Sequence, residues 1–202
     1  MKHVITYQNL RTNIGLLGLL LPIILAFGVD FEIKPSISHF YYTDMGVVFT
    51  GVLWVFGWLL ISYRGYDSDN LITTIAGVLI IIVSLVPTAH LAGENQAPNA
   101  HQDEMKNYIH LFSAGTFFIL MGYMSFCSFT QESGIGLVKT RRRRIYRVSG
   151  VMVWLSIALL IPVTTLEINL TGIDVYLGET VALFFFGISW LVKSKSLKMI
   201  GL

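Results

Sequence analysis

Four ionisable side chains lie beside or within apolar sequence and are the residues best suited to chemistry. They are His39, Asp44, His110 and Glu179. Imidazoles and carboxylates that lie close together act as general acids and bases, and they also bind transition metals. An ionisable group inside an apolar stretch usually faces the interior of a helix bundle or a watery cavity. We therefore take these four as candidate catalytic residues of one polar site.

A short polar stretch, KPSISHFYYTDMG at 34–46, supplies candidate ligand-binding residues. Ser36, Ser38 and Tyr42 belong to this group, and Arg64 joins it from the tight turn after the next apolar run. Three residues of this stretch and of the turn also have structural interpretations. Tyr42 suits the aromatic belt of a membrane interface, Asp44 suits a helix N-cap, and Arg64 suits a pairing with Asp67 or a phosphate.

Three imidazoles could also form a metal site. A catalytic zinc ion takes three protein ligands and a water, and His39, His90 and His110 would supply such a set. The sequence contains no HExxH, no HxxxH and no cysteine pair. A zinc site, a proton relay and a site for a polar headgroup therefore stay open, and the cofactor is unknown. If the protein is an enzyme, this residue set favours a metal-dependent membrane hydrolase.

The elements that position these residues are expected to be membrane-spanning helices. Of the 202 residues, 54% are hydrophobic and only 13% are charged, against about 25% charged in soluble domains. A span needs about 20 mostly apolar residues. Six runs qualify, at approximately 13–29, 44–63, 71–90, 108–129, 147–166 and 175–192. The sequence predicts an all-α polytopic membrane helical bundle, with residues 1–202 forming a single integral membrane domain.

Basic residues predict the orientation of the six spans, because they concentrate on the cytoplasmic side. With both termini inside, all but Lys34 and Lys106 of the 14 basic residues face the cytoplasm. Those inside are Lys2, Arg11, Arg64, Lys139, Arg141, Arg142, Arg143, Arg144, Arg147, Lys193, Lys195 and Lys198. We therefore expect an N-in, C-in topology. It places the candidate site at the outer face and Arg64 at the inner face.

The basic run TRRRRIYR at 140–147 is the main feature of the predicted inner face. Each basic residue near an anionic membrane surface contributes about 1 kcal/mol of attraction. We expect Arg141, Arg142, Arg143 and Arg144 to attract anionic lipid, although a role in setting topology also explains the run. Nucleic-acid binding is not expected.

Several phrases carry a resemblance across most of the chain: SISHFYY, VFTGVLWVFGWLLISYRGYD and ETVALFFFGISWLVK. Together they resemble a family of small, uncharacterised bacterial polytopic proteins. The layout is similar to that of the Frag1/DRAM/Sfk1 group of six-span proteins. This resemblance implies a multi-pass protein of the bacterial inner membrane and implies no established activity.

A second resemblance concerns residue types only. Ser36, His39, Asp44 and His110 are similar in kind to the Ser, Asp and His set of the alkaline ceramidase and adiponectin-receptor superfamily. Members of that superfamily are zinc-dependent membrane hydrolases with seven spans and a late HxxxH pair. This chain has six predicted spans and no histidine after His110.

Three functions follow from these observations. The first is an outward-facing polar pocket that binds or processes a lipid-like or small polar ligand. The second is a non-enzymatic accessory or assembly subunit, whose outer surface docks a membrane protein partner. The third is a small proton-coupled transporter, which would require polar groups deeper in the bilayer.

Overall fold

The computed structural model describes residues 7–66, 69–88, 100–131, 136–165 and 170–195. Throughout these residues the secondary structure is helical, without a β-strand. The elements are α1 (Tyr7–Phe27), η1 (Ile37–Tyr42), α2 (Gly46–Ser62), α3 (Asp69–Leu85), α4 (Ala100–Tyr123), η2 (Met124–Ser128), η3 (Phe129–Gln131), α5 (Leu137–Thr165) and α6 (Asp174–Ser194). The predicted all-α class is therefore confirmed for the described part of the chain.

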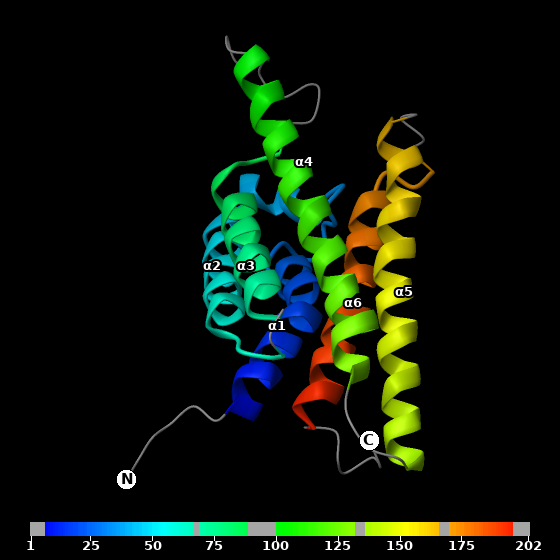
Figure 1. Cartoon of the computed structure of the whole chain (residues 1–202). Coiled ribbons are helices and arrows are strands. Elements are labelled where there is room, and N and C mark those ends of the chain that lie inside the picture. Colours follow the sequence, from blue (N-terminus) through cyan, green and yellow to red (C-terminus); the bar gives the residue numbers. More distant parts are fainter. Residues whose placement is uncertain (1–6, 67–68, 89–99, 132–135, 166–169, 196–202) are drawn as a thin grey trace.

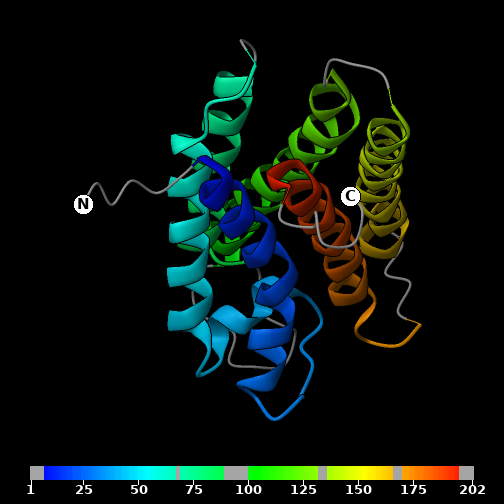
Figure 2. The same cartoon turned by 90° about the horizontal axis from the view of Figure 1, so that it is seen from below.

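The six α-helices form one bundle in which successive helices run in opposite directions (Figure 1). Helices α2 and α3 pair on one side and α5 lies on the other, with α1 and α6 packed together between them (Figure 2). The short helix η1 lies across one end of the bundle, here called the η1 end. The opposite end, where α2 ends and Arg64 follows, is called the Arg64 end.

Four helical segments among the described residues are long and apolar enough to cross a membrane. They are Tyr7–Phe27, Glu104–Gln131, Leu137–Thr164 and Asp174–Ser194. Helices α2 and α3 are apolar but have only 17 residues each. Because a span needs about 20 residues, these four segments support a membrane-embedded bundle, while six spans stay a prediction.

Aromatic side chains fill the centre of the bundle, where large rings bury much apolar area and pack edge-to-face. Phe56 of α2 contacts Phe117 of α4 and Phe186 of α6, with ring centroids 5.9 and 5.5 Å apart. Trp190 extends this cluster toward the Arg64 end, where its ring centroid lies 4.8 Å from that of Tyr63.

Glycines allow two helix pairs to approach closely. A Cβ atom on Gly187 of α6 would lie 2.7 Å from the carbonyl oxygen of Gly15 of α1. A Cβ atom on Gly77 of α3 would lie 2.5 Å from the carbonyl oxygen of Gly57 of α2. Small residues at such contacts are typical of helix packing in membranes.

The basic run lies on a helix rather than in a loop. Helix α5 begins at Leu137, well before the expected start near residue 147, and it carries all four arginines on its first turns. Arg141 and Arg144 are exposed, whereas Arg142 is buried and Arg143 is half-buried. A helix points successive side chains in different directions, so the four arginines do not present one common surface.

Candidate functional site

The candidate site is built on η1, which follows Pro35 at the entry to α2. Ser36 precedes the helix in an extended conformation, and its carbonyl oxygen accepts a hydrogen bond from the His39 amide. Side chains three residues apart eclipse each other in a 3₁₀ helix. The Oγ atom of Ser36 accordingly lies 2.7 Å from Nδ1 of His39. Just before this segment, the ammonium of the half-buried Lys34 lies 2.7 Å from the exposed Glu32 carboxylate and lowers the pKa of Glu32.

Hydrogen bonds from α6 and from the end of α3 fix the position of η1. The amide of Ile37 donates to Oε2 of Glu179 at 2.7 Å. The carbonyl oxygen of Pro35 accepts from the Tyr176 amide at 2.8 Å. The hydroxyl of Tyr42 donates to the carbonyl oxygen of Thr88 at 2.6 Å. These bonds satisfy polar backbone groups that would be costly to leave unpaired in an apolar bundle.

His110 is buried in α4 and connects η1 to the end of α3. Its Nδ1 atom lies 2.6 Å from the carbonyl oxygen of Val86, so this nitrogen carries the proton and donates. Its Nε2 atom, which lies 2.8 Å from Oγ of Ser38, must then accept the Ser38 hydroxyl proton. A hydroxyl, an imidazole and an orienting acceptor form the arrangement that activates a nucleophilic serine.

These groups line a cavity of about 500 Å³, called here the η1 cavity. The polar part of its wall contains Ser36, Ser38, His39, Thr88, Asn107, His110, Thr164 and Glu179. The apolar part contains Pro35, Leu111, Ala114, Val163 and Val175. Leu111 of α4 and Thr164 of α5 are exposed and mark the rim. The cavity therefore has access from the side of the bundle between α4 and α5.

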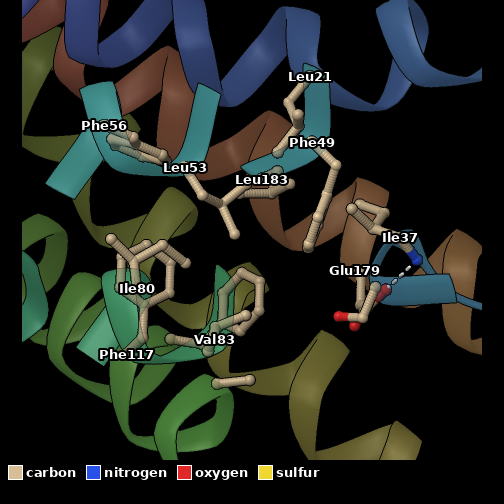
Figure 3. Close-up of a pocket in the computed structure, with 13 residues that line it drawn as sticks. Leu21, Ile37, Phe49, Leu53, Phe56, Ile80, Val83, Phe117, Glu179 and Leu183 are labelled. Atoms are coloured by element: carbon tan, nitrogen blue, oxygen red, sulfur yellow. Dashed lines mark hydrogen bonds between the residues drawn. The ribbon is translucent and has the colours of Figure 1, made fainter. Parts of the chain in front are cut away.

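A smaller apolar cavity of about 40 Å³, called the core cavity, lies deeper in the bundle. Figure 3 shows Glu179 at one edge of this cavity, with its bond to Ile37, and the rings of Phe49 and Phe117 on other sides. Ser38, Ala114 and Glu179 line both cavities. These three residues therefore form the wall that separates the polar space from the apolar core.

The structure brings together some of the predicted site residues and separates others. His39, His110, Glu179, Ser36 and Ser38 all line the η1 cavity.

The remaining predicted residues lie elsewhere. Asp44 is exposed at the entry to α2 and does not line the cavity. Tyr42 also lies outside the lining, and its bond to Thr88 makes it a positioning residue. Arg64 lies at the opposite end of the bundle, where its Nη1 atom donates to the carbonyl oxygens of Ile61 and Tyr63.

The metal hypothesis does not fit the described residues. Both ring nitrogens of His110 are engaged, one by Val86 and the other by Ser38, so neither presents a lone pair to a metal. Within the described ranges no three His, Cys, Asp or Glu side chains are arranged to hold a metal ion. His90 lies outside the described residues. We derive no chemistry from zinc.

The sequence predicted that the segment with Ser36 and Ser38 shares a site with His110, but it did not predict two specific contacts. The pairing of Ser38 with His110 joins residues 72 positions apart. Thr88 and Asn107 also line the cavity, and the Thr88 hydroxyl lies 3.2 Å from Oδ1 of Asn107. No local spacing indicates contacts between separate helices, so the sequence pointed toward this site only through the ionisable groups His39, His110 and Glu179 beside or within apolar sequence.

Comparison with known proteins leaves the site to be interpreted from its geometry. No family model, curated protein or solved structure matches the chain. The resemblance to small bacterial six-span proteins therefore stays a prediction.

Proposed function

We propose that the η1 cavity binds the polar head of an amphiphile within the membrane. The observation that supports this proposal is the mixed lining of one cavity. Hydroxyls, imidazoles and the Glu179 side chain line it together with the apolar side chains of Leu111, Val163 and Val175. Binding sites typically combine apolar surface with a few fixed polar groups.

The polar groups favour a head that both donates and accepts hydrogen bonds. The Oε2 atom of Glu179 accepts a hydrogen bond from the Ile37 amide, whereas serine hydroxyls and histidine rings both donate and accept. A hydroxyl- or amine-bearing head suits this set. The exposed rim at Leu111 and Thr164 would let an acyl chain leave sideways between α4 and α5.

Native mass spectrometry of the purified chain tests this binding. The detergent-solubilised protein is loaded with dihexanoyl phosphatidylethanolamine, and Ala114→Leu is compared with Gly115→Leu. Ala114 lines both cavities, whereas a Cβ atom on Gly115 would meet no atom within 4 Å. We expect Ala114→Leu to lose the bound lipid and Gly115→Leu to keep it. Equal retention by both variants would contradict the proposal.

A second candidate function is metal-independent acyl transfer, which the Ser38–His110 pair favours. In this scheme Oγ of Ser38 attacks the carbonyl carbon of an ester, and its proton passes to Nε2 of His110. His110 then protonates the departing alcohol, and water releases the acyl group from Ser38. The Val86 carbonyl would hold the ring in the required tautomer throughout.

A fluorophosphonate probe distinguishes catalysis from binding alone, because it reacts with activated serines. We expect labelling of the wild-type chain and of Ser36→Ala, and none of Ser38→Ala. The Ser36 hydroxyl pairs with His39 and is a matched control. Absence of labelling in the wild type, together with retained lipid, would leave binding as the function.

The membrane setting of this proposal is six spans with both termini in the cytoplasm of a bacterial cell. The support is the predicted charge distribution, which, combined with the alternating helix directions, predicts that the η1 end faces outward. The exposed Arg141 and Arg144 would then contact anionic lipid at the inner surface. A docking role for a membrane protein partner is the alternative if the cavity binds nothing.

A further inference from the structure

A second cavity, at the Arg64 end, combines cationic and aromatic side chains. It has a volume of about 350 Å³ and is called here the basic pocket. Its lining residues are Tyr7, Arg11, Tyr63, Arg64, Gly65, Tyr66, Lys193 and Lys195. Half of these eight residues are cationic and none is acidic. The start of α1, the segment after α2 and the end of α6 therefore meet around one positively charged space.

Aromatic rings hold two of the cations. The Arg11 guanidinium lies 4.7 Å from the ring centroid of Tyr7 and 5.5 Å from that of Tyr63. Those two rings stack at 5.6 Å with an interplanar angle of 22°. The Nζ atom of the buried Lys193 lies 5.0 Å from the Tyr66 centroid and 5.3 Å from the Phe129 centroid. Cation–π contacts orient a charge without neutralising it.

Arg64 has a structural explanation, because its Nη1 atom donates to the carbonyl oxygens of Ile61 and Tyr63 at the end of α2. The buried Asp69 lies behind the pocket wall at Gly65. Its carboxylate oxygens accept hydrogen bonds from the Ser128 hydroxyl and the Tyr66 amide. The cations proposed below to contact a ligand in this pocket are therefore Arg11, Lys193 and Lys195.

We infer that the basic pocket is a binding site for a phosphate group. Small-molecule sites typically enclose about 300–1,000 Å³, so the volume suits a phosphate ester. Arginine and lysine are the usual partners of phosphate oxygens, and tyrosine hydroxyls add further donors. The phosphate belongs either to an anionic lipid of the adjacent leaflet or to a soluble phosphate compound. This site is separate from the η1 cavity and does not depend on the function proposed for it.

Binding to the purified full chain tests this inference with three probes. They are inorganic phosphate, dihexanoyl phosphatidylglycerol and dihexanoyl phosphatidylcholine, each titrated at constant ionic strength. Arg11→Gln and Lys195→Gln each remove one charge from the pocket, and Lys34→Gln removes one from the segment before η1, at the opposite end of the bundle. Size-exclusion profiles and unfolding temperatures establish that each variant is folded. If Arg11→Gln does not fold, the binding of Lys195→Gln alone tests the inference. The Lys195 side chain is exposed, so its replacement should leave the fold intact.

We expect saturable binding that Lys34→Gln leaves unchanged and that the pocket variants weaken about tenfold or more, as one lost charge-assisted hydrogen bond predicts. Preference for phosphatidylglycerol over both other probes would identify a lipid as the source. Tight binding of inorganic phosphate, undisturbed by lipid, would identify a soluble compound. Equal weakening by Lys34→Gln, or no saturable binding of any probe to the wild type, would overturn the inference.

Discussion

The Nε2 atom of His110 lies 2.8 Å from the Oγ atom of Ser38, although 72 positions separate the two residues in the chain. The Nδ1 atom of the same ring donates a hydrogen bond to the Val86 carbonyl oxygen at 2.6 Å. One imidazole thus connects η1, the end of α3 and the interior of α4. The relative positions of these three elements therefore depend on that connection.

Replacement of His110 by alanine should destabilise the protein, because it removes two hydrogen bonds and leaves a void beside Ser38. We expect the free energy of unfolding to fall by about 2–4 kcal/mol. Denaturant titration in mixed micelles measures this change. Leu111→Ala is the control, because Leu111 is 49% exposed and shares the same turn of α4. Similar losses in both variants would show that His110 acts only by filling space.

Replacement of Glu179 separates the role of its hydrogen bond from that of its charge. Glu179→Gln keeps a side-chain oxygen that can accept the proton of the Ile37 amide, so stability should change little. Glu179→Ala leaves that buried donor without its partner and should cost about 1–3 kcal/mol. Unfolding of the two variants in the same detergent provides the comparison. A glutamine variant as unstable as the alanine variant would contradict this explanation.

The contact between α1 and α6 predicts a difference between two glycine substitutions. An alanine Cβ at position 187 would lie 2.7 Å from the carbonyl oxygen of Gly15, so Gly187→Ala should destabilise by about 1–3 kcal/mol through overpacking. At Gly51 of α2 an added Cβ would meet no atom within 4 Å, so Gly51→Ala should be neutral or stabilising. Unfolding temperatures of the two variants measure the difference. Equal destabilisation would show that the close approach is unimportant.

Orientation in the membrane can be tested by cysteine labelling in a Cys127→Ser background. Asp44 and Lys195 are both exposed and lie at opposite ends of the bundle. In spheroplasts, a membrane-impermeant maleimide should label Asp44→Cys at once and Lys195→Cys only after permeabilisation. The reverse labelling pattern would place the η1 end in the cytoplasm. The η1 cavity would then lie at the inner face and the basic pocket at the outer face.

Helix existence was largely predictable from the sequence, because long apolar runs leave few alternatives. Helix ends were less predictable. The arginines before residue 147 suggested a loop, yet α5 starts at Leu137, since arginine and lysine have high helix propensity. Conversely, α2 and α3 have 17 residues each, fewer than the expected spans.

The candidate site was predictable in residue type but not in pairing. Burial of His110 and Glu179 followed from their apolar neighbours. The contact of Ser36 with His39 follows from 3₁₀ geometry, but only once η1 is known to be a 3₁₀ helix. Asp44 illustrates the limit of proximity in sequence, because the chain turns between η1 and α2 and leaves its side chain exposed.

The bond between the Ile37 amide and Glu179 joins positions 142 residues apart, and this separation constrains biogenesis. A ribosome releases η1 long before it has made α6. The Ile37 amide therefore cannot form this bond until the last helix has been made. The η1 cavity is consequently completed late in synthesis, and a chain truncated before α6 would lack one wall of the site.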